Sequence, residues 1–238
     1  LRYVGRDLRL ITGLMGKVPL SHLNQKQQQD LETIRSLYQQ QKSMYEQKIH
    51  RVDNRIVSIN QPYVRPIVRG KAGAETEFGA KLSISLTDGY ARLEKCSWEN
   101  FNEGNTLIEQ VEAYKQRGGY YPEVVLVDQI YRTRENRAYC KSKGIRLSGP
   151  PLGRPRAEGT KEQKRQTYQE NCIRNAIEGK FGEGKRRYGL GCIMAKLKET
   201  SESVIALQFL VMNLEARLRF LFYRILQTWF RSPIYAVS

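Results

Sequence analysis

Histidine is scarce in this chain of 238 residues, which has only His22 and His50. Cysteine is scarce as well: there are four cysteines, at least 20 residues apart, with no Cys-x-x-Cys pair among them. Structural zinc sites use closely spaced cysteine and histidine ligands, so no zinc site can be argued from this spacing. The expectation is scattered, buried thiols in a reducing cytoplasm.

Long apolar runs are also missing. The first 20 residues carry several charges, which is unlike a signal peptide. The most apolar segment, from Val204 to Phe230, is interrupted by Glu215 and three arginines. This pattern predicts a buried or interface helix and no membrane partner.

Acidic residues are outnumbered, with 24 Asp plus Glu against 40 Lys plus Arg, a formal charge of +16 and a pI near 9.8. A surplus of lysine can simply keep a surface soluble. Here the positive charge clusters in the runs 132–146 and 180–187, which favours a nucleic-acid partner.

The N-terminal part reads as helical. Residues 24–50 have apolar side chains near the helical period and no Gly or Pro, and Pro19 and Ser21 precede them. Residues 1–16 are expected to form a partner helix. The chain divides accordingly into a helical segment (1–50), the main domain (51–230) and a short tail (231–238).

The main domain reads as mixed α/β. A basic segment (51–71), extended because Pro62 and Pro66 prevent a helix, precedes a hairpin with strands at 78–86 and 90–98. Helices are expected at 103–118, 133–143, 163–185, 194–198 and 203–230. Short strands are expected at 124–127, which reads as a buried central strand, and at 145–147; a Gly/Pro loop follows at 148–155. Strands that alternate with helices predict a mixed sheet covered on both faces.

Two carboxylates stand out in this order of elements. Glu178 lies between Arg174 and Lys185 at spacings of four and seven, so all three share one helix face. Asp128 ends the apolar run Glu123-Val-Val-Leu-Val-Asp128. The alternatives are a solvated charge ladder for Glu178 and a helix N-cap for Asp128. Asp88, in the hairpin turn, is interpreted as a backbone-determined turn residue.

These residues carry a resemblance. Arg174, Glu178 and Lys185 match the Tyr-x2-Arg-x3-Glu-x6-Lys signature of bacterial insertion-sequence transposases of the DDE type, although Asn171 replaces the tyrosine. The phrases Val127-Asp-Gln-Ile-Tyr-Arg-Thr-Arg-Glu-Asn136 and Gly144-Ile-Arg-Leu-Ser-Gly-Pro-Pro-Leu-Gly-Arg-Pro155 resemble the same family. The resemblance covers about 51–219 and is densest over 124–190.

The resemblance implies a ribonuclease H-like fold that cuts and joins DNA with two Mg²⁺ (or Mn²⁺) ions. Asp128 and Glu178 are then the catalytic metal ligands. The DNA-binding residues are basic side chains of the same helix: Arg174, Lys180, Lys185, Arg186 and Arg187. It also implies duplex DNA (element ends and target) as partner, a homodimer in the active full-length protein, and a bacterial, nucleoid-associated location in the cytoplasm.

The family's first aspartate has no clear counterpart here. Asp53 is the best internal substitute, but the expectation is that the first strand and its aspartate lie outside this chain, which would leave the fragment inactive. The glycines at 179, 182 and 184 are poor helix formers and predict close backbone approach, with DNA as the expected neighbour.

Two rival functions remain open on the sequence. The first is a basic nucleic-acid-binding protein without catalysis, in which both acids are structural. The second is a ribosome- or RNA-associated protein, which is weaker because the 14 tyrosines are dispersed and no RNA-binding signature occurs.

Overall fold

The structure is a computed structural model that describes residues 1–17, 20–71, 74–150 and 160–231. The chain separates into two compact units, which are described separately. The first comprises Leu1–Lys81, Cys96–Phe101 and Ala195–Thr200. The second comprises Leu82–Lys95, Asn102–Met194 and Ser201–Ser238.

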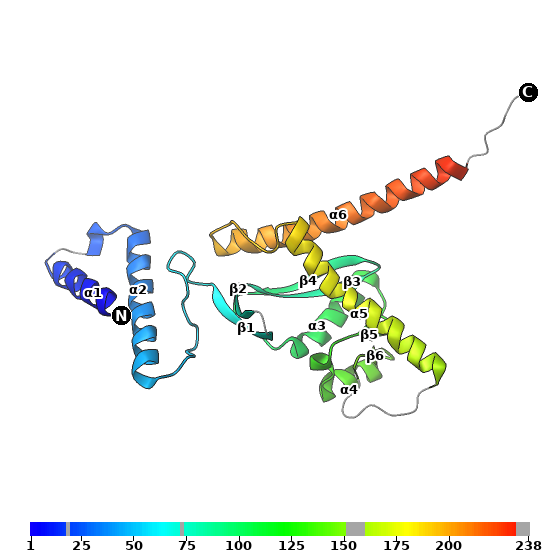
Figure 1. Cartoon of the computed structure of the whole chain (residues 1–238), viewed down its shortest axis with the longest axis horizontal. Coiled ribbons are helices and arrows are strands. Elements are labelled where there is room, and N and C mark those ends of the chain that lie inside the picture. Colours follow the sequence, from blue (N-terminus) through cyan, green and yellow to red (C-terminus); the bar gives the residue numbers. More distant parts are fainter. Residues whose placement is uncertain (18–19, 72–73, 151–159, 232–238) are drawn as a thin grey trace, which may run out of the picture. The chain divides into compact units, whose positions relative to one another are not determined.

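Helices α1 (Arg2–Met15) and α2 (Gln25–Gln47) begin the first unit, joined through a short 3-10 turn at Leu20–His22 (Figure 1). Asn24 starts α2, because its side chain accepts from the Gln27 N–H (2.8 Å) while the Gln27 side chain accepts from the Asn24 N–H (2.9 Å). The predicted helical hairpin is therefore confirmed, with Asn24 as its cap.

The extended basic segment ends in a strand. Strand β1 (Arg65–Lys71) pairs antiparallel with β2 (Ala74–Gly79), and Pro66 lies opposite Phe78. Because proline cannot donate to a ladder, it suits a strand with a neighbour on one side only, as β1 has among the described strands.

The predicted second hairpin consists of β3 (Lys81–Thr87) and β4 (Tyr90–Ser97). Its turn places Asp88 (φ 51°) and Gly89 (φ 83°) in the left-handed region, as a type I′ turn requires. The interpretation of Asp88 as a turn residue agrees with this geometry.

The second unit continues with α3 (Leu107–Gly118), β5 (Val124–Leu126), α4 (Arg134–Ser142) and β6 (Arg146–Ser148). Strands β5 and β6 are parallel, with Val125 opposite Leu147. Beneath them lies an apolar core formed by Leu107, Val111, Val127, Cys140 and Ile145. These elements agree with the sequence-based order to within a few residues.

The mixed α/β class is confirmed, but a single continuous sheet is not seen. The described strands form three separate pairs, β1–β2, β3–β4 and β5–β6. Val124–Leu126 is only partly buried, not the buried central strand that was expected, because β6 is its one hydrogen-bonded neighbour among the described strands.

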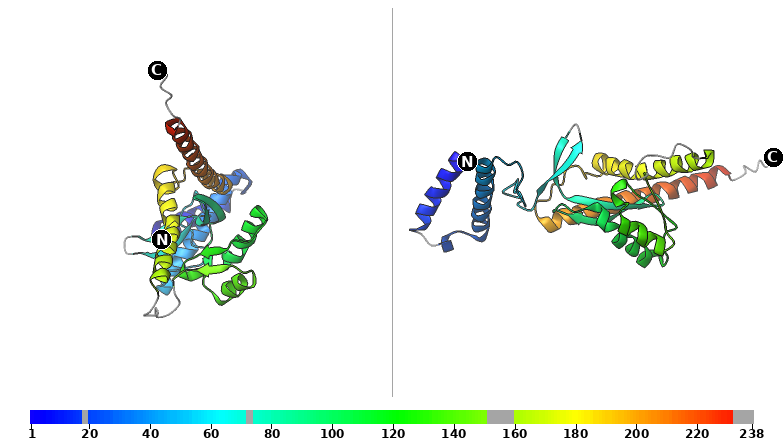
Figure 2. Two further views of the ribbon diagram at one scale, coloured as in Figure 1. Left: turned by 90° about the vertical axis from the view of Figure 1, so that its right-hand side faces the viewer. Right: turned by 90° about the horizontal axis from the view of Figure 1, so that it is seen from below.

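Two long helices complete the unit. Helix α5 (Lys161–Arg187) begins with a capping box formed by Thr160 and Gln163. Helix α6 (Lys198–Arg231) is one unbroken helix in both views of Figure 2. The expected helix at 194–198 is wrong, since residues before Lys198 are not helical. Most of the predicted loop at 148–155 lies outside the described residues.

Two expectations from the composition have different outcomes. None of the described helices combines the length and apolar character needed to cross a membrane. All four cysteines are free, but only Cys140 is buried, so the expectation of buried thiols is wrong for Cys172 and Cys192, which are exposed.

Candidate active site beside helix α5

Asp128 lies directly after β5. The Val127 N–H donates to the Ser148 carbonyl (2.9 Å), which extends the β5–β6 ladder by one residue. Asp128 stays extended (φ −74°, ψ 166°), and its side chain makes no capping hydrogen bond to the following 3-10 turn. With a side chain 69% exposed, it does not act as a side-chain N-cap.

Buried polar contacts fix the backbone around Asp128. Asn136 is buried and donates from Nδ2 to the carbonyls of Gly104 (2.7 Å) and Tyr131 (2.8 Å). Arg132 donates from Nη1 to the carbonyl of Gly149 (3.0 Å). A Cβ atom at Gly149 would collide with the carbonyl of Val127, so only glycine allows the chain after β6 to pass this close to β5.

A stripe of charged residues on α5 faces these strand ends. Glu170 pairs with Arg146 (2.7 Å) and accepts from the Ser148 hydroxyl at the end of β6. The hydrogen bond from Arg146 is the main reason that the pKa of Glu170 is lowered. One turn later, Nε of Arg174 lies 3.3 Å from Oδ1 of Asp128.

Glu178 lies one further turn along this stripe, about 6 Å along the helix axis from Arg174, and is exposed. Arg174 is paired with Asp128 and not with Glu178, which argues against the charge-ladder interpretation among the described residues. The structure therefore brings Asp128 to α5 one turn from Glu178. No group of three His, Cys, Asp or Glu residues suited to a metal ion occurs in the described part of the chain.

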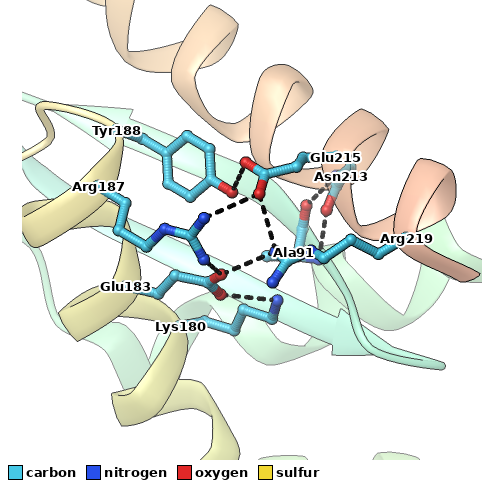
Figure 3. Close-up of polar contacts among 8 residues, drawn as sticks. All are labelled: Ala91, Lys180, Glu183, Arg187, Tyr188, Asn213, Glu215 and Arg219. Carbon is cyan, nitrogen blue, oxygen red and sulfur yellow. Dashed lines mark hydrogen bonds and ion pairs between the residues drawn. The ribbon is translucent and has the colours of Figure 1, made fainter.

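Two of the predicted DNA-binding cations form ion pairs with acids of the same chain. Lys180 pairs with Glu183 (3.0 Å), and Arg187 pairs with Glu215 of α6 (2.9 Å). Figure 3 shows these pairs in one network, which Arg219 joins through Glu183 (3.2 Å). Lys185, Arg186 and Arg187 are all exposed.

The network shifts the pKa values of its acids. The hydrogen bond from Lys180, and then the one from Arg219, lower the pKa of Glu183. The Tyr188 hydroxyl donates to Glu215 and lowers the pKa of that carboxyl, with Arg187 contributing. Burial, followed by the contact with Glu215, raises the pKa of Tyr188.

The glycine at 184 has a different neighbour from the one expected. A Cβ atom there would lie 3.0 Å from Leu190 and 3.1 Å from Met212 of α6. Close approach is therefore correct at Gly184, but the neighbour is the protein's own apolar core. Around Gly179, beside Glu178, a Cβ atom would meet nothing within 4 Å.

The sequence reading missed the acids that organise α5: Glu170, Glu183 and Glu215. A signal for two of them was present, because Glu183 and Arg187, like Glu215 and Arg219, are spaced at i and i+4. Their partners on other elements could not be read from spacing.

The second unit is thus a mixed α/β domain with two exposed carboxylates at one site. The aspartate follows a parallel strand and pairs with an arginine, and the glutamate lies one helical turn from that arginine. Residues 125–215 match the family model of a transposase DDE domain, so this part of the chain is similar to such domains. The match runs from β5 into α6 and includes Asp128, Arg174 and Glu178. Neither a curated protein nor a solved structure matches the chain.

Proposed function

We propose that Asp128 and Glu178 supply two of the metal-binding carboxylates of a site that cuts and joins DNA during transposition. The contact between Arg174 and Asp128 carries the proposal, because it holds one acid against α5 a single turn from the other. The transposase DDE match over the same residues supports the assignment.

The residue types fit the metal that this chemistry needs. Magnesium and manganese prefer hard oxygen ligands, and both side chains are exposed carboxylates. A bound Mg²⁺ or Mn²⁺ pair would activate the attacking water or 3′-hydroxyl and stabilise the leaving oxygen. The contact with Arg174 would orient Asp128 for metal binding.

The order of contacts along α5 supports a proposal for the position of a third carboxylate. Along α5, Glu170 faces the end of β6 and Arg174 faces the end of β5, so Glu178 comes next. Each step is about 6 Å, close to the strand spacing of about 4.8 Å. From this order we infer that an aspartate on a further strand beside β5, near Glu178, would complete the site.

Asp53 does not fill that position by secondary structure, since it lies in a turn and not on a strand. We therefore propose that the 238-residue chain binds DNA but does not cut it. Nicking of a duplex by the purified chain in Mg²⁺ or Mn²⁺, lost on Asp53→Asn, would contradict this proposal.

The substrate in this proposal is duplex DNA, at the ends of a bacterial insertion sequence and at its target. Lys185 and Arg186 are exposed in the last turn of α5, two turns beyond Glu178. Side chains so placed would contact phosphates without reading the sequence.

Iron-mediated cleavage of the protein backbone tests the metal site directly. Fe²⁺ bound in place of Mg²⁺ generates hydroxyl radicals with peroxide and ascorbate, and we expect cuts near residues 128 and 178 that excess Mg²⁺ suppresses. Asp128→Asn or Glu178→Gln should remove both cuts, whereas Glu183→Gln, a matched change on the same helix, should retain them. An unchanged pattern in Glu178→Gln refutes the ligand assignment.

A further inference from the structure

A pocket in the second unit is built from other elements than those that carry Asp128 and Glu178. It has a volume of about 310 Å³ and is lined by the β3–β4 turn, the start of β4, the end of α3 and Asn213 of α6. None of the described residues that line it belongs to β5, β6 or α5. Pockets for small molecules begin at about 300 Å³, so this space is sufficient for one compact ligand.

Two hydrogen bonds fix the strand that lines this pocket. Asn213 accepts at Oδ1 from the Ala91 N–H of β4 (2.9 Å) and donates from Nδ2 to the Ala91 carbonyl (2.6 Å), as Figure 3 shows. Ala91 is completely buried. The backbone between Tyr90 and Arg92 is therefore held against α6, and the pocket has a firm wall on this side.

Tyrosine rings form much of the remaining lining. Helix α3 ends at Gly119, whose left-handed backbone (φ 79°) turns the chain so that Tyr120 meets Tyr114 edge to face, with 6.0 Å between the ring centroids. Tyr120 is nevertheless 63% exposed, and Tyr90 is 39% exposed. An exposed tyrosine ring at the wall of a pocket suits a flat, conjugated ligand such as a nucleobase, because stacking needs one accessible ring face.

Two arginines and one carboxylate supply the charged groups. Arg117 is held by Glu94 through two hydrogen bonds (2.8 and 3.2 Å), which fix the direction of its guanidinium. Arg92 is exposed and forms no ion pair with a described residue. The hydroxyl contact with Tyr120 is the main reason that the pKa of Tyr114 is raised, and the negative charge of Asp88 contributes. The pocket thus offers cations to an anionic group and, at Asp88, an acceptor to an amine.

We infer that this pocket binds a nucleoside 5′-monophosphate, either as a free nucleotide or as an unpaired nucleotide of a DNA strand. The base would stack on Tyr120, and the phosphate would pair with Arg92 and with the outer N–H groups of Arg117. Asp88 would accept from an amine on the base edge, which favours adenine over thymine. The inference does not rest on the metal chemistry proposed above, because no proposed metal ligand lines the pocket.

Fluorescence of the 5′-monophosphate of 2-aminopurine deoxyriboside, which is quenched by stacking, tests the site in the full chain. The titration is made in EDTA, so that the metal site plays no part. We expect Tyr120→Ala to raise the dissociation constant about 5- to 100-fold, whereas Tyr120→Phe, which keeps the ring, should stay within about threefold. Tyr223→Ala is the matched control, because Tyr223 is 59% exposed and lies outside the pocket.

Competition by other nucleotides tests the contacts to the base and the phosphate. dAMP should displace the fluorescent nucleotide at lower concentration than dTMP does. Asp88→Asn should reduce this preference, and asparagine tolerates the left-handed backbone at this position (φ 51°). Arg92→Gln should weaken dAMP about fivefold or more and leave deoxyadenosine, which has no phosphate, unchanged.

Two DNA competitors distinguish the sources of the ligand. Displacement by a duplex with one unpaired adenine, but not by the fully paired duplex, assigns the pocket to a DNA strand. Displacement by dAMP and by neither duplex assigns it to free nucleotides. Three results would overturn the inference: no quenching at millimolar nucleotide, equal affinity in Tyr120→Ala and Tyr223→Ala, or equal displacement by both duplexes.

Discussion

Glu178 and Glu183 lie five residues apart on α5 and have opposite surroundings. Glu183 has cations on three sides, Lys180, Arg187 and Arg219, and its side chain is 21% exposed. Glu178 is exposed on the turn after Arg174, beside a glycine with open space around it. The same residue type on one helix is thus surrounded by cations of the protein in one case and exposed to solvent in the other.

The two surroundings suit two different roles for a glutamate on one helix, a structural role and a metal-binding role. A carboxylate whose charge is already balanced by its own protein fixes the position of α5 against α6. A carboxylate left exposed beside a second acid can accept a divalent ion. The pair therefore offers matched variants in which the same change, glutamate to glutamine, should have different consequences.

The largest expected contrast is in transposition itself. In cells that carry the intact element, we expect Glu178→Gln to lower the transposition frequency by about a thousandfold or more, because the change removes one of the two proposed metal ligands. Glu183→Gln should lower it by less than about tenfold, in proportion to the folded fraction. Equal losses in both variants would show that the contrast between the two acids has no catalytic meaning.

Thermal or urea unfolding should give the reverse order. Glu183→Gln removes the acid shared by three cations, and we expect a loss of about 1–2 kcal/mol in the free energy of unfolding, reduced from a buried-pair value because the network is partly exposed. Glu178→Gln should change it by less than about 0.5 kcal/mol. A larger loss in Glu178→Gln would make that acid structural.

The basic end of α5 allows the same comparison for DNA binding. Arg186→Ala should reduce the slope of log affinity against log salt by about 0.9, the change expected for one phosphate contact. Arg187→Ala should change the slope less, because Glu215 and Glu183 already balance its charge. Filter binding of one duplex across a salt series measures both, and an equal change in both variants contradicts the assignment.

The smallest effect is the dependence of stability on pH. Since the pKa values of Glu183 and Glu215 are lowered in the folded protein, the unfolded chain binds more protons near the ordinary value of 4.5. Stability should therefore be fully present above that pH and fall as the pH drops through and below it. Unfolding measured at several pH values should show that the free energy of unfolding falls less steeply in Glu183→Gln than in the unmodified chain. An identical fall in the two proteins would show that Glu183 does not contribute to the pH dependence.

The candidate site was predictable where local pattern decides it. Apolar runs and the alternation of strands with helices predicted the order of β5, α4, β6 and α5, and the four-residue spacing placed Arg174 and Glu178 on one face. The partner of Arg174 was not predictable, because Glu178 on the same helix and Asp128, far away in the sequence after β5, are both carboxylates. Only packing of α5 against the strand ends selects Asp128.

The sequence alone determined the helix and strand types, the excess of positive charge and the identities of the two acids, because propensity, periodicity and charge are local properties of the chain. The tertiary structure decided which charged side chains form ion pairs within the protein. It paired Glu183 with Lys180 and Arg187, and Arg187 with Glu215 of α6, whereas Asp128 and Glu178 stayed exposed. It also buried one apolar face of α6 and left the other exposed. Burial and pairing depend on residues far apart in the sequence, so no local pattern contains them.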